Sequence, residues 1–129
     1  MQILIDSHFA IAHLRKSLAP ESSPLAGLMA DRSNKLNFSV ASLWEIAIKT
    51  RLGKLDPGMP LESIARYFET VGVKVLPVTE IHAVTEAVPV PGTRDPFDRM
   101  LLAQCEAEGL RLLTSDRALA GHRLAFKAD

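Results

Sequence analysis

The strongest constraint on the fold is an alternation of short apolar strands with helical segments. The chain starts with Ile3-Leu4-Ile5, an apolar run that stops at Asp6. Such a run fits a strand buried on both faces. Further strands are predicted at 36–40, 73–76 and 110–114, with a last edge strand at 124–126. Strands in this order between helices indicate an α/β fold whose parallel sheet is covered on both faces.

Helical spacing of apolar residues predicts the connecting helices. They are expected at 9–18, 24–30, 42–52, 61–70, 79–87 and 96–108, with a short helical turn at 116–120. Gly53 and Gly109 follow two of them as stop signals. Ser42 and Glu45 have the spacing of a capping box, and Asp95-Pro96 is typical of a helix start.

Composition indicates one soluble domain over residues 1–129. Hydrophobic residues make up 47% of the chain, which is enough for one core. Fifteen basic residues balance fifteen acidic ones, so acidic and basic groups are expected to gather in different places. The single cysteine, the absence of a signal peptide and the lack of a long apolar run favour a cytoplasmic protein that does not enter a membrane. Cys105 and Trp44 are both expected in the core.

Two acids stand at the ends of predicted strands. Asp6 directly follows the first strand, and Asp116 follows the strand at 110–114. In open parallel sheets, ligands bind beyond the C-terminal ends of the strands. Each Asp also fits a helix N-cap, but two at equivalent strand ends favour a shared site.

Two further acids lie near the starts of predicted helices. Glu45, with Ser42 and Lys49, forms the only polar stripe on a helix that is otherwise apolar, and Glu45 and Lys49 are spaced for an ion pair. Asp98 precedes an apolar stripe and is expected to point inward, while Asp95 faces the rim. Buried carboxylates in one cleft repel each other, and a divalent cation relieves that repulsion. An oxygen-only site suits Mg²⁺ or Mn²⁺, which serve phosphate chemistry.

Four segments in this order resemble the PIN-domain family, and within it the VapC-type toxins of type II toxin–antitoxin pairs. The segments are 3–8, 41–49, 94–101 and 113–116, and the resemblance covers nearly the whole chain. It implies a PIN-like, three-layer α/β/α fold with a small parallel sheet. It also implies a Mg²⁺-dependent endoribonuclease (Mn²⁺ is the alternative ion) that hydrolyses RNA phosphodiester bonds.

The family's acidic quartet matches Asp6, Glu45, Asp98 and Asp116. In the resulting hypothesis Asp6, Asp98 and Asp116 hold the metal, Glu45 acts through a water molecule, and Asp95 is an auxiliary acid. The resemblance also implies an RNA substrate, a homodimer and a cognate antitoxin that blocks the acidic cleft.

Hydroxyl and basic side chains next to the acids are candidate substrate contacts. Ser7 and Ser115 adjoin Asp6 and Asp116, and cations close to a metal site suit phosphates. The candidate set is Ser7, Lys49, Arg94, Arg99 and Ser115.

Two other functional classes stay open on the sequence. One is a non-catalytic PIN-like module that binds RNA or protein, in which the acids are only caps and ion pairs. The other is a phosphotransfer domain with Asp6 as nucleophile, although Ser7-His8-Phe9-Ala10 lacks the second acid that this chemistry usually places close behind.

Overall fold

A four-stranded, all-parallel sheet organises the chain in the order β3-β2-β1-β4. The computed structural model describes residues 1–127. The strands are β1 (Gln2–Ile5), β2 (Lys35–Ser39), β3 (Lys74–Leu76) and β4 (Arg111–Leu113). The α-helices are α1 (Ser7–Leu14), α2 (Ala26–Ala30), α3 (Val40–Arg51), α4 (Ile64–Thr70), α5 (Glu80–Val84), α6 (Pro96–Glu108) and α7 (Arg117–Ala120). Two 3₁₀ turns complete the elements, η1 (Pro20–Ser22) and η2 (Leu61–Ser63).

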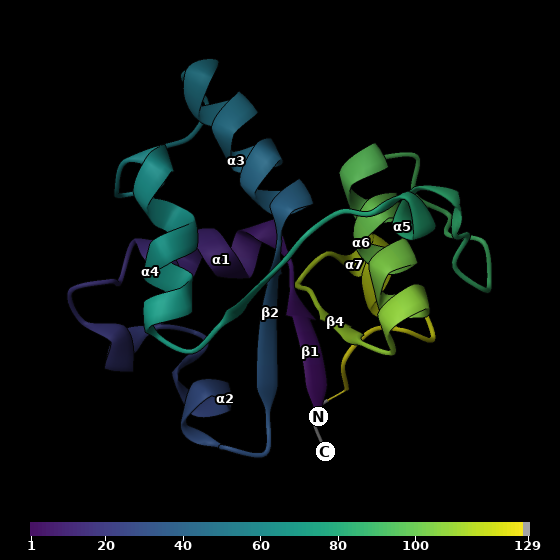
Figure 1. The fold of residues 1–129 in the computed structure, drawn as a ribbon, viewed down its shortest axis with the longest axis horizontal. Coiled ribbons are helices and arrows are strands. Elements are labelled where there is room, and N and C mark those ends of the chain that lie inside the picture. Colours follow the sequence, from purple (N-terminus) through teal and green to yellow (C-terminus); the bar gives the residue numbers. More distant parts are fainter. Residues whose placement is uncertain (128–129) are drawn as a thin grey trace.

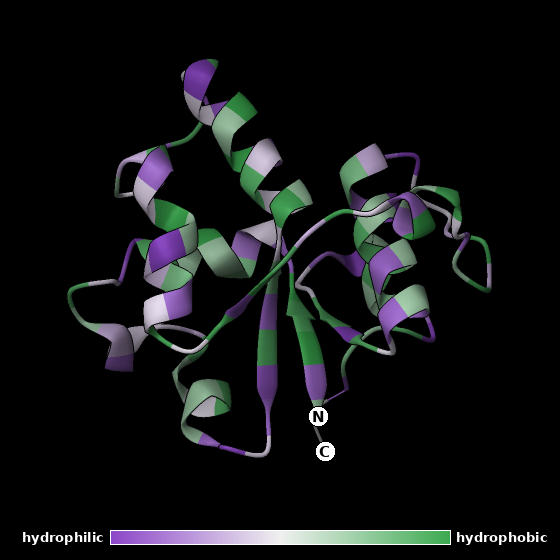
Figure 2. Cartoon of the chain, in the orientation of Figure 1, coloured by the Kyte–Doolittle hydropathy of each residue, from purple (hydrophilic) through white to green (hydrophobic). Residues whose placement is uncertain are grey.

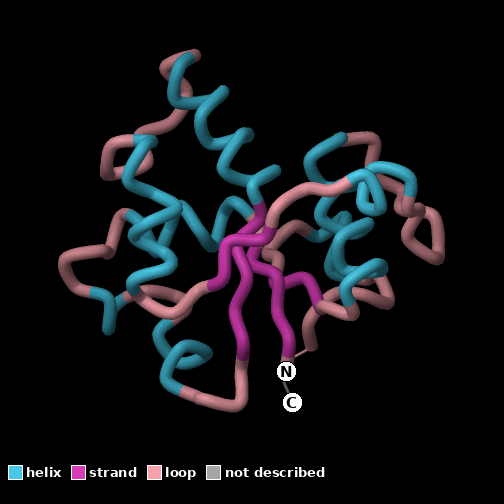
Figure 3. Tube along the Cα trace, viewed as in Figure 1, coloured by secondary structure: helices cyan, strands magenta, loops and turns pink. Residues whose placement is uncertain are grey.

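Helices on both faces of the sheet make the three layers predicted from the sequence (Figure 1). On one face, Ile3, Ile5 and Phe38 pack with side chains of α1, α3 and α4. On the other face, Leu4 and Leu112 pack with side chains of α6 and α7. The alternation of β1 side chains between two clusters explains why its whole apolar run is buried. The tube in Figure 3 shows the sheet running between the two groups of helices.

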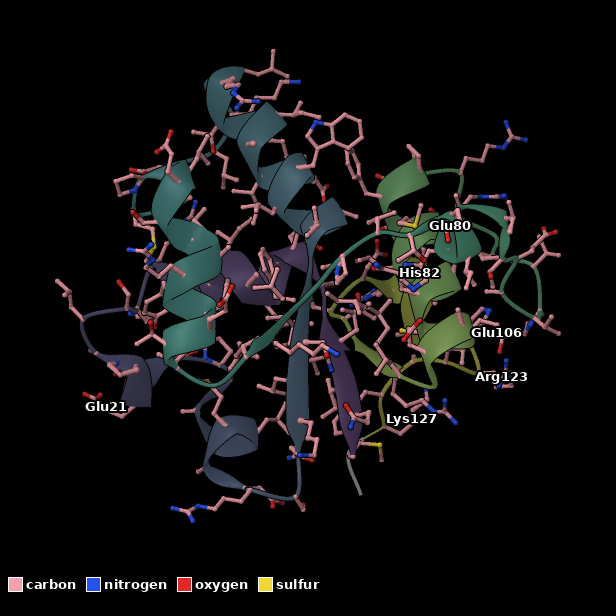
Figure 4. The ribbon with its side chains drawn as sticks, viewed as in Figure 1. Glu21, Glu80, His82, Glu106, Arg123 and Lys127 are labelled. Carbon is pink, nitrogen blue, oxygen red and sulfur yellow. The ribbon has the colours of Figure 1, made fainter. Side chains whose placement is uncertain are left out.

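Polar contacts tie the helices together on each side. His13 of α1 is buried between Ser23, whose Oγ lies 2.6 Å from Nδ1, and Tyr67, whose hydroxyl lies 2.8 Å from Nε2. On the other side, Arg123 forms an ion pair with Glu106 of α6 at 2.7 Å, and the two side chains point toward each other in Figure 4. These contacts hold connecting segments against the sheet layers.

The predicted strands are found except for the last one. Ala125 makes only an isolated bridge to Leu112, so 124–126 is not a strand. The first helix begins two residues earlier than predicted, at Ser7 after the Asp6 cap, and ends four residues earlier, at Leu14. Leu18, which the prediction included, is fully exposed and has no core to join.

The capping box at Ser42 and Glu45 was a wrong prediction. Helix α3 begins at Val40, and its cap is Ser39, whose Oγ accepts the Ala41 N–H at 3.0 Å. Ser42 is buried inside the first turn, and its Oγ has no hydrogen-bond partner in the described chain. Glu45 is therefore free of any capping role.

Trp44 was also placed wrongly, because its side chain is 60% exposed rather than in the core. It packs edge-to-face against Phe97 of α6, with ring centroids 5.7 Å apart. Cys105 is fully buried as predicted, and burial raises the pKa of its thiol to about 12. Cys105 is therefore a core residue and not a nucleophile.

We predict that the two serines at the start of α3 contribute differently to stability. Ser39→Ala should lower the free energy of unfolding by about 1 kcal/mol, because it removes the helix cap. Ser42→Ala should change it by less than about 0.5 kcal/mol or raise it, because the lost hydroxyl makes no bond. Urea denaturation of both variants measures the difference, and a larger loss for Ser42→Ala would contradict the observed cap position.

Candidate functional site: an acidic edge of the sheet

The parallel sheet brings separated segments of the chain to its C-terminal edge. Asp6 follows β1, and its backbone N–H donates to Leu113 O at the end of β4 at 3.0 Å. Asp116 follows β4 after a two-residue turn, and α3 leaves the end of β2 directly. Since β1 lies between β2 and β4, Asp6 emerges between the segments that carry Glu45 and Asp116.

Three aspartates at this edge are helix caps, as the sequence allowed. Asp6 accepts the Phe9 N–H at 2.9 Å, and Asp116 accepts the Ala118 N–H at 2.8 Å. Asp95 accepts N–H groups from the first turn of α6. In each case the cap bonds use Oδ1, so the other oxygen of each carboxylate takes no part in capping. Capping and ligand binding are therefore compatible, and the cap holds the carboxylate in one orientation.

Glu45 is a buried carboxylate with one direct cationic partner. Its side chain is on α3 with 7% of its surface exposed, and Lys49 Nζ lies 2.8 Å from its Oε2. The ion pair one turn apart was predicted from the sequence. Lys49 itself is about half exposed, so it screens the carboxylate without closing it off.

The Asp98 carboxyl group is affected by its burial and by the charges of other acids. Burial raises the pKa of its carboxyl group from the ordinary value to about 6. The next causes, in decreasing order, are the negative charges of Asp95, Asp116 and Glu45. Acids from α6, the start of α7 and α3 thus repel one another at this edge. Asp98 is half-buried, while Asp95 is exposed at the rim as predicted.

The donor set fits a hard divalent cation held loosely. The side chains are carboxylates without a cysteine or histidine cluster, and their mutual repulsion favours a positive ion among them. Within residues 1–127, however, no three acidic, histidine or cysteine side chains lie close enough to form a ready-made metal cluster. A divalent cation at this edge would take one or two of the carboxylates directly and keep water molecules as its other ligands.

The candidate substrate contacts differ in their surroundings. Ser7 is buried at the start of α1, while Ser115 is exposed beside Asp116. Arg94 is exposed and makes no hydrogen bond or ion pair in the described part of the chain. Arg99 instead donates from Nε to Thr93 O at 2.7 Å, so its guanidinium holds the loop before α6.

An apolar groove beside the acids was missed by the sequence reasoning. It has a volume of about 490 Å³ and lies between α3 and α6, with Trp44 and Phe97 among its lining residues. Both are direct chain neighbours of site acids, Glu45 and Asp98. The sequence contained an indication of this groove, namely the apolar residues on nearly all sides of α3. Such a helix is either fully buried or exposes an apolar face that a partner can bind.

Comparisons with known proteins agree with the family resemblance and with the fold. The PIN domain family matches residues 3–123 of the chain. Ribonuclease VapC22 of Mycobacterium tuberculosis is 29% identical over 126 residues, which cover 94% of this chain and 92% of that protein.

A solved structure is similar in fold. It is the crystal structure of VapBC2 from Rickettsia felis bound to a DNA fragment from the VapBC2 promoter. The TM-score is 0.60 with 13% sequence identity, and the match covers 90% of this chain and 88% of that chain.

Among the described residues, no helix is long and apolar enough to cross a membrane.

We predict that Asp98 destabilises the metal-free protein above about pH 6. Its raised pKa means that ionisation costs the folded state free energy once the pH exceeds the ordinary value of about 3.9. In EDTA, Asp98→Asn should therefore raise Tm at about pH 8, and the gain should shrink as the pH falls through 6. Thermal unfolding followed by circular dichroism measures both.

Asp31→Asn is the matched control with the opposite sign. Hydrogen bonds from Ser33 lower the pKa of Asp31, so its ionised form stabilises the fold at neutral pH. Its replacement should lower Tm at about pH 8, with a loss that vanishes as the pH falls through the lowered pKa. A lower Tm for Asp98→Asn at about pH 8 would contradict the crowding of acids at this edge.

Proposed function

This chain belongs to the PIN domain family, and on that premise we propose that it is the toxin of a type II toxin–antitoxin pair. We propose that it acts as an endoribonuclease that hydrolyses RNA phosphodiester bonds with the help of Mg²⁺ or Mn²⁺. The observation that carries the proposal is that Asp6 and Asp116 follow the ends of the neighbouring strands β1 and β4, while Glu45 lies on the helix that leaves β2, the other neighbour of β1. The name of the relative VapC22, a ribonuclease, supports the same reaction class.

In this proposal Asp6, Asp98 and Asp116 hold the divalent cation, and Glu45 contributes through a water molecule. The caps on Asp6 and Asp116 leave one oxygen of each carboxylate available. The cation would neutralise the phosphate and activate the attacking water when bound. Without a cation, the negatively charged carboxylates would repel the negatively charged phosphodiester. This donor set therefore requires the ion.

Glu45 and Lys49 supply the chain's own acid–base pair. Lys49 Nζ lies 2.8 Å from Glu45 Oε2 and orients the carboxylate, so Glu45 would be placed to accept a proton from the attacking water. In hydrolysis the water oxygen bonds to phosphorus, the bond from phosphorus to the leaving ribose oxygen breaks, and that oxygen gains a proton. The exposed part of Lys49 can contact a phosphate oxygen.

Among the other substrate contacts, Arg94 is the best supported. It is exposed near Asp95 and has no partner within residues 1–127, so its guanidinium is available for phosphate. Ser115 and Ser7 adjoin Asp116 and Asp6 and would contact RNA through their hydroxyls. Arg99 would act indirectly, because it orders the loop that precedes Asp95.

The proposed partners are a cognate antitoxin and a second copy of the chain. The solved structure with a similar fold is a VapBC2 complex, which supports a protein partner. Exposed apolar side chains around the groove, such as Trp44 and Val78, are the kind of surface that partners cover. We propose the cytoplasm as the place of action, where RNA is available.

The two alternatives from the sequence have less support. A phosphotransfer domain usually places a second acid close behind the nucleophilic Asp6, but Ser7-His8-Phe9-Ala10 contains none. In a non-catalytic module the four acids would be expendable. No observed contact favours either alternative over the nuclease.

We predict that the purified chain cleaves single-stranded RNA only with a divalent cation. Asp6→Asn and Asp98→Asn should each lower kcat/KM by about a hundredfold or more, because each removes charge that holds the ion. A fluorogenic RNA assay with Mg²⁺, Mn²⁺ or EDTA measures the rates. Asp31→Asn serves as control, because Asp31 is exposed in the loop before β2.

Full activity in EDTA would overturn metal dependence. Unchanged activity in Asp6→Asn and Asp98→Asn, with native circular dichroism spectra, would remove the acids from the mechanism. Absence of cleavage in every condition would favour the binding module.

We predict growth arrest when the chain is expressed in a bacterium, and relief of that arrest in the Asp6→Asn and Asp98→Asn variants. The physical reason is that toxicity would require catalysis and not merely binding. Colony counts after induction measure the effect, with protein levels compared by immunoblot. Equal arrest by wild type and both variants would contradict a nuclease toxin.

A further inference from the structure

One part of the sheet carries polar side chains where the rest of the sheet carries apolar ones. Alternation along β2 puts Lys35, Asn37 and Ser39 on one face, and the pairing of Asn37 with Lys74 puts Lys74 on the same face. This is the face on which α6 and α7 cover Leu4 and Leu112 farther along the sheet. Figure 2 shows hydrophilic residues at the starts of β1 and β2. The N-terminal part of this face is therefore polar in a sheet that is otherwise apolar.

A pocket of about 590 Å³ opens at this polar region. Its lining includes three basic residues, Arg32, Lys35 and Lys74. None of their side chains forms an ion pair or hydrogen bond within residues 1–127, and all three are exposed. Three unpaired cations around one cavity produce a positive potential that favours an anion.

The remaining polar groups add fixed hydrogen-bonding capacity. Gln2 and Asn37 line the pocket, and the buried Asn37 amide is held by its bond to Ile3 O at 3.1 Å. One carboxylate, Glu108, also lines it, but Glu108 Oε2 is engaged with His82 Nε2 at 3.0 Å. The pocket therefore has an excess of positive charge together with neutral amides.

This pocket lies at the opposite end of the strands from the acidic edge. Gln2 and Lys35 begin β1 and β2, whereas Asp6 and Asp116 follow the ends of β1 and β4. The net charge of zero thus hides two regions of opposite sign. Phosphate groups are the biological anions that Lys and Arg clusters bind best, and the volume lies in the usual range of about 300–1,000 Å³ for small-ligand sites.

We infer that the pocket lined by Arg32, Lys35 and Lys74 binds a phosphate-bearing ligand of about nucleotide size. The phosphate would lie among the three cations, and the Gln2 and Asn37 amides would contact the rest of the ligand. The ligand is either a free nucleotide or a phosphate of an RNA chain. This site does not depend on the nuclease, since it uses none of the acids at the other edge.

Nuclear magnetic resonance titration of the full chain in EDTA tests the inference. The probes are ADP, a short single-stranded RNA with a 5′-phosphate, and sodium chloride as the ionic-strength control. Binding should shift the amide signals of Gln2, Lys35 and Lys74. A response to ADP alone identifies the nucleotide source, and a response to RNA alone identifies the RNA source.

Two double variants distinguish binding in this pocket from non-specific attraction of the ligand to basic residues elsewhere on the surface. Lys35→Gln combined with Lys74→Gln should weaken binding by about tenfold, because two phosphate contacts are lost. Arg51→Gln combined with Lys54→Gln is the matched control, because it removes the same charge from the exposed end of α3 and the segment after it. Asp6→Asn should leave ADP binding unchanged even if the nuclease proposal fails.

The inference is overturned by an absence of shifts at millimolar ADP and RNA. Equal weakening in the two double variants, or shifts centred on Asp6 and Asp98, would overturn it as well. Thermal unfolding shows whether each variant is folded, which is expected of the two double variants because their four replaced residues are exposed.

Discussion

Burial of β1 on both faces and both edges is the constraint on which the rest of the structure depends. Ile3, Leu4 and Ile5 have no exposed surface, and their side chains alternate between the two apolar clusters. A shift of the strand by one residue would exchange the faces and bring Gln2 or Asp6 into the core. The position of Asp6 at the sheet edge therefore follows from the packing of three apolar residues.

The acids at that edge combine a structural and a chemical role. Asp6 and Asp116 are the N-caps of α1 and α7. Their carboxylates accept backbone N–H groups, and these hydrogen bonds restrain the orientation of the carboxylates. Glu45 has no such role, because Ser39 caps its helix. The ion pair with Lys49 is local to the helix, but the burial of Glu45 has no explanation in capping, so Glu45 is the acid whose burial is best understood through a site.

Charge separation along the strands extends this picture to the whole sheet. Acids gather beyond the C-terminal ends of the strands, while Arg32, Lys35 and Lys74 surround the pocket at the other end. The numbers of acidic and basic residues are equal, but the two kinds of charge are concentrated at opposite ends of the sheet.

The sequence by itself determined the parallel α/β fold and the candidate acids, because strand and helix periods are local and the motif spacing is linear. It also determined the start and end of α6, since Asp95-Pro96 and Gly109 act on adjacent backbone groups. The choice between Ser39 and Ser42 as cap, the exposure of Trp44 and the partial burial of Asp98 were decided only by the tertiary structure. Each of these depends on which segments pack side by side, and burial and charge interaction arise from that packing and not from neighbours along the chain.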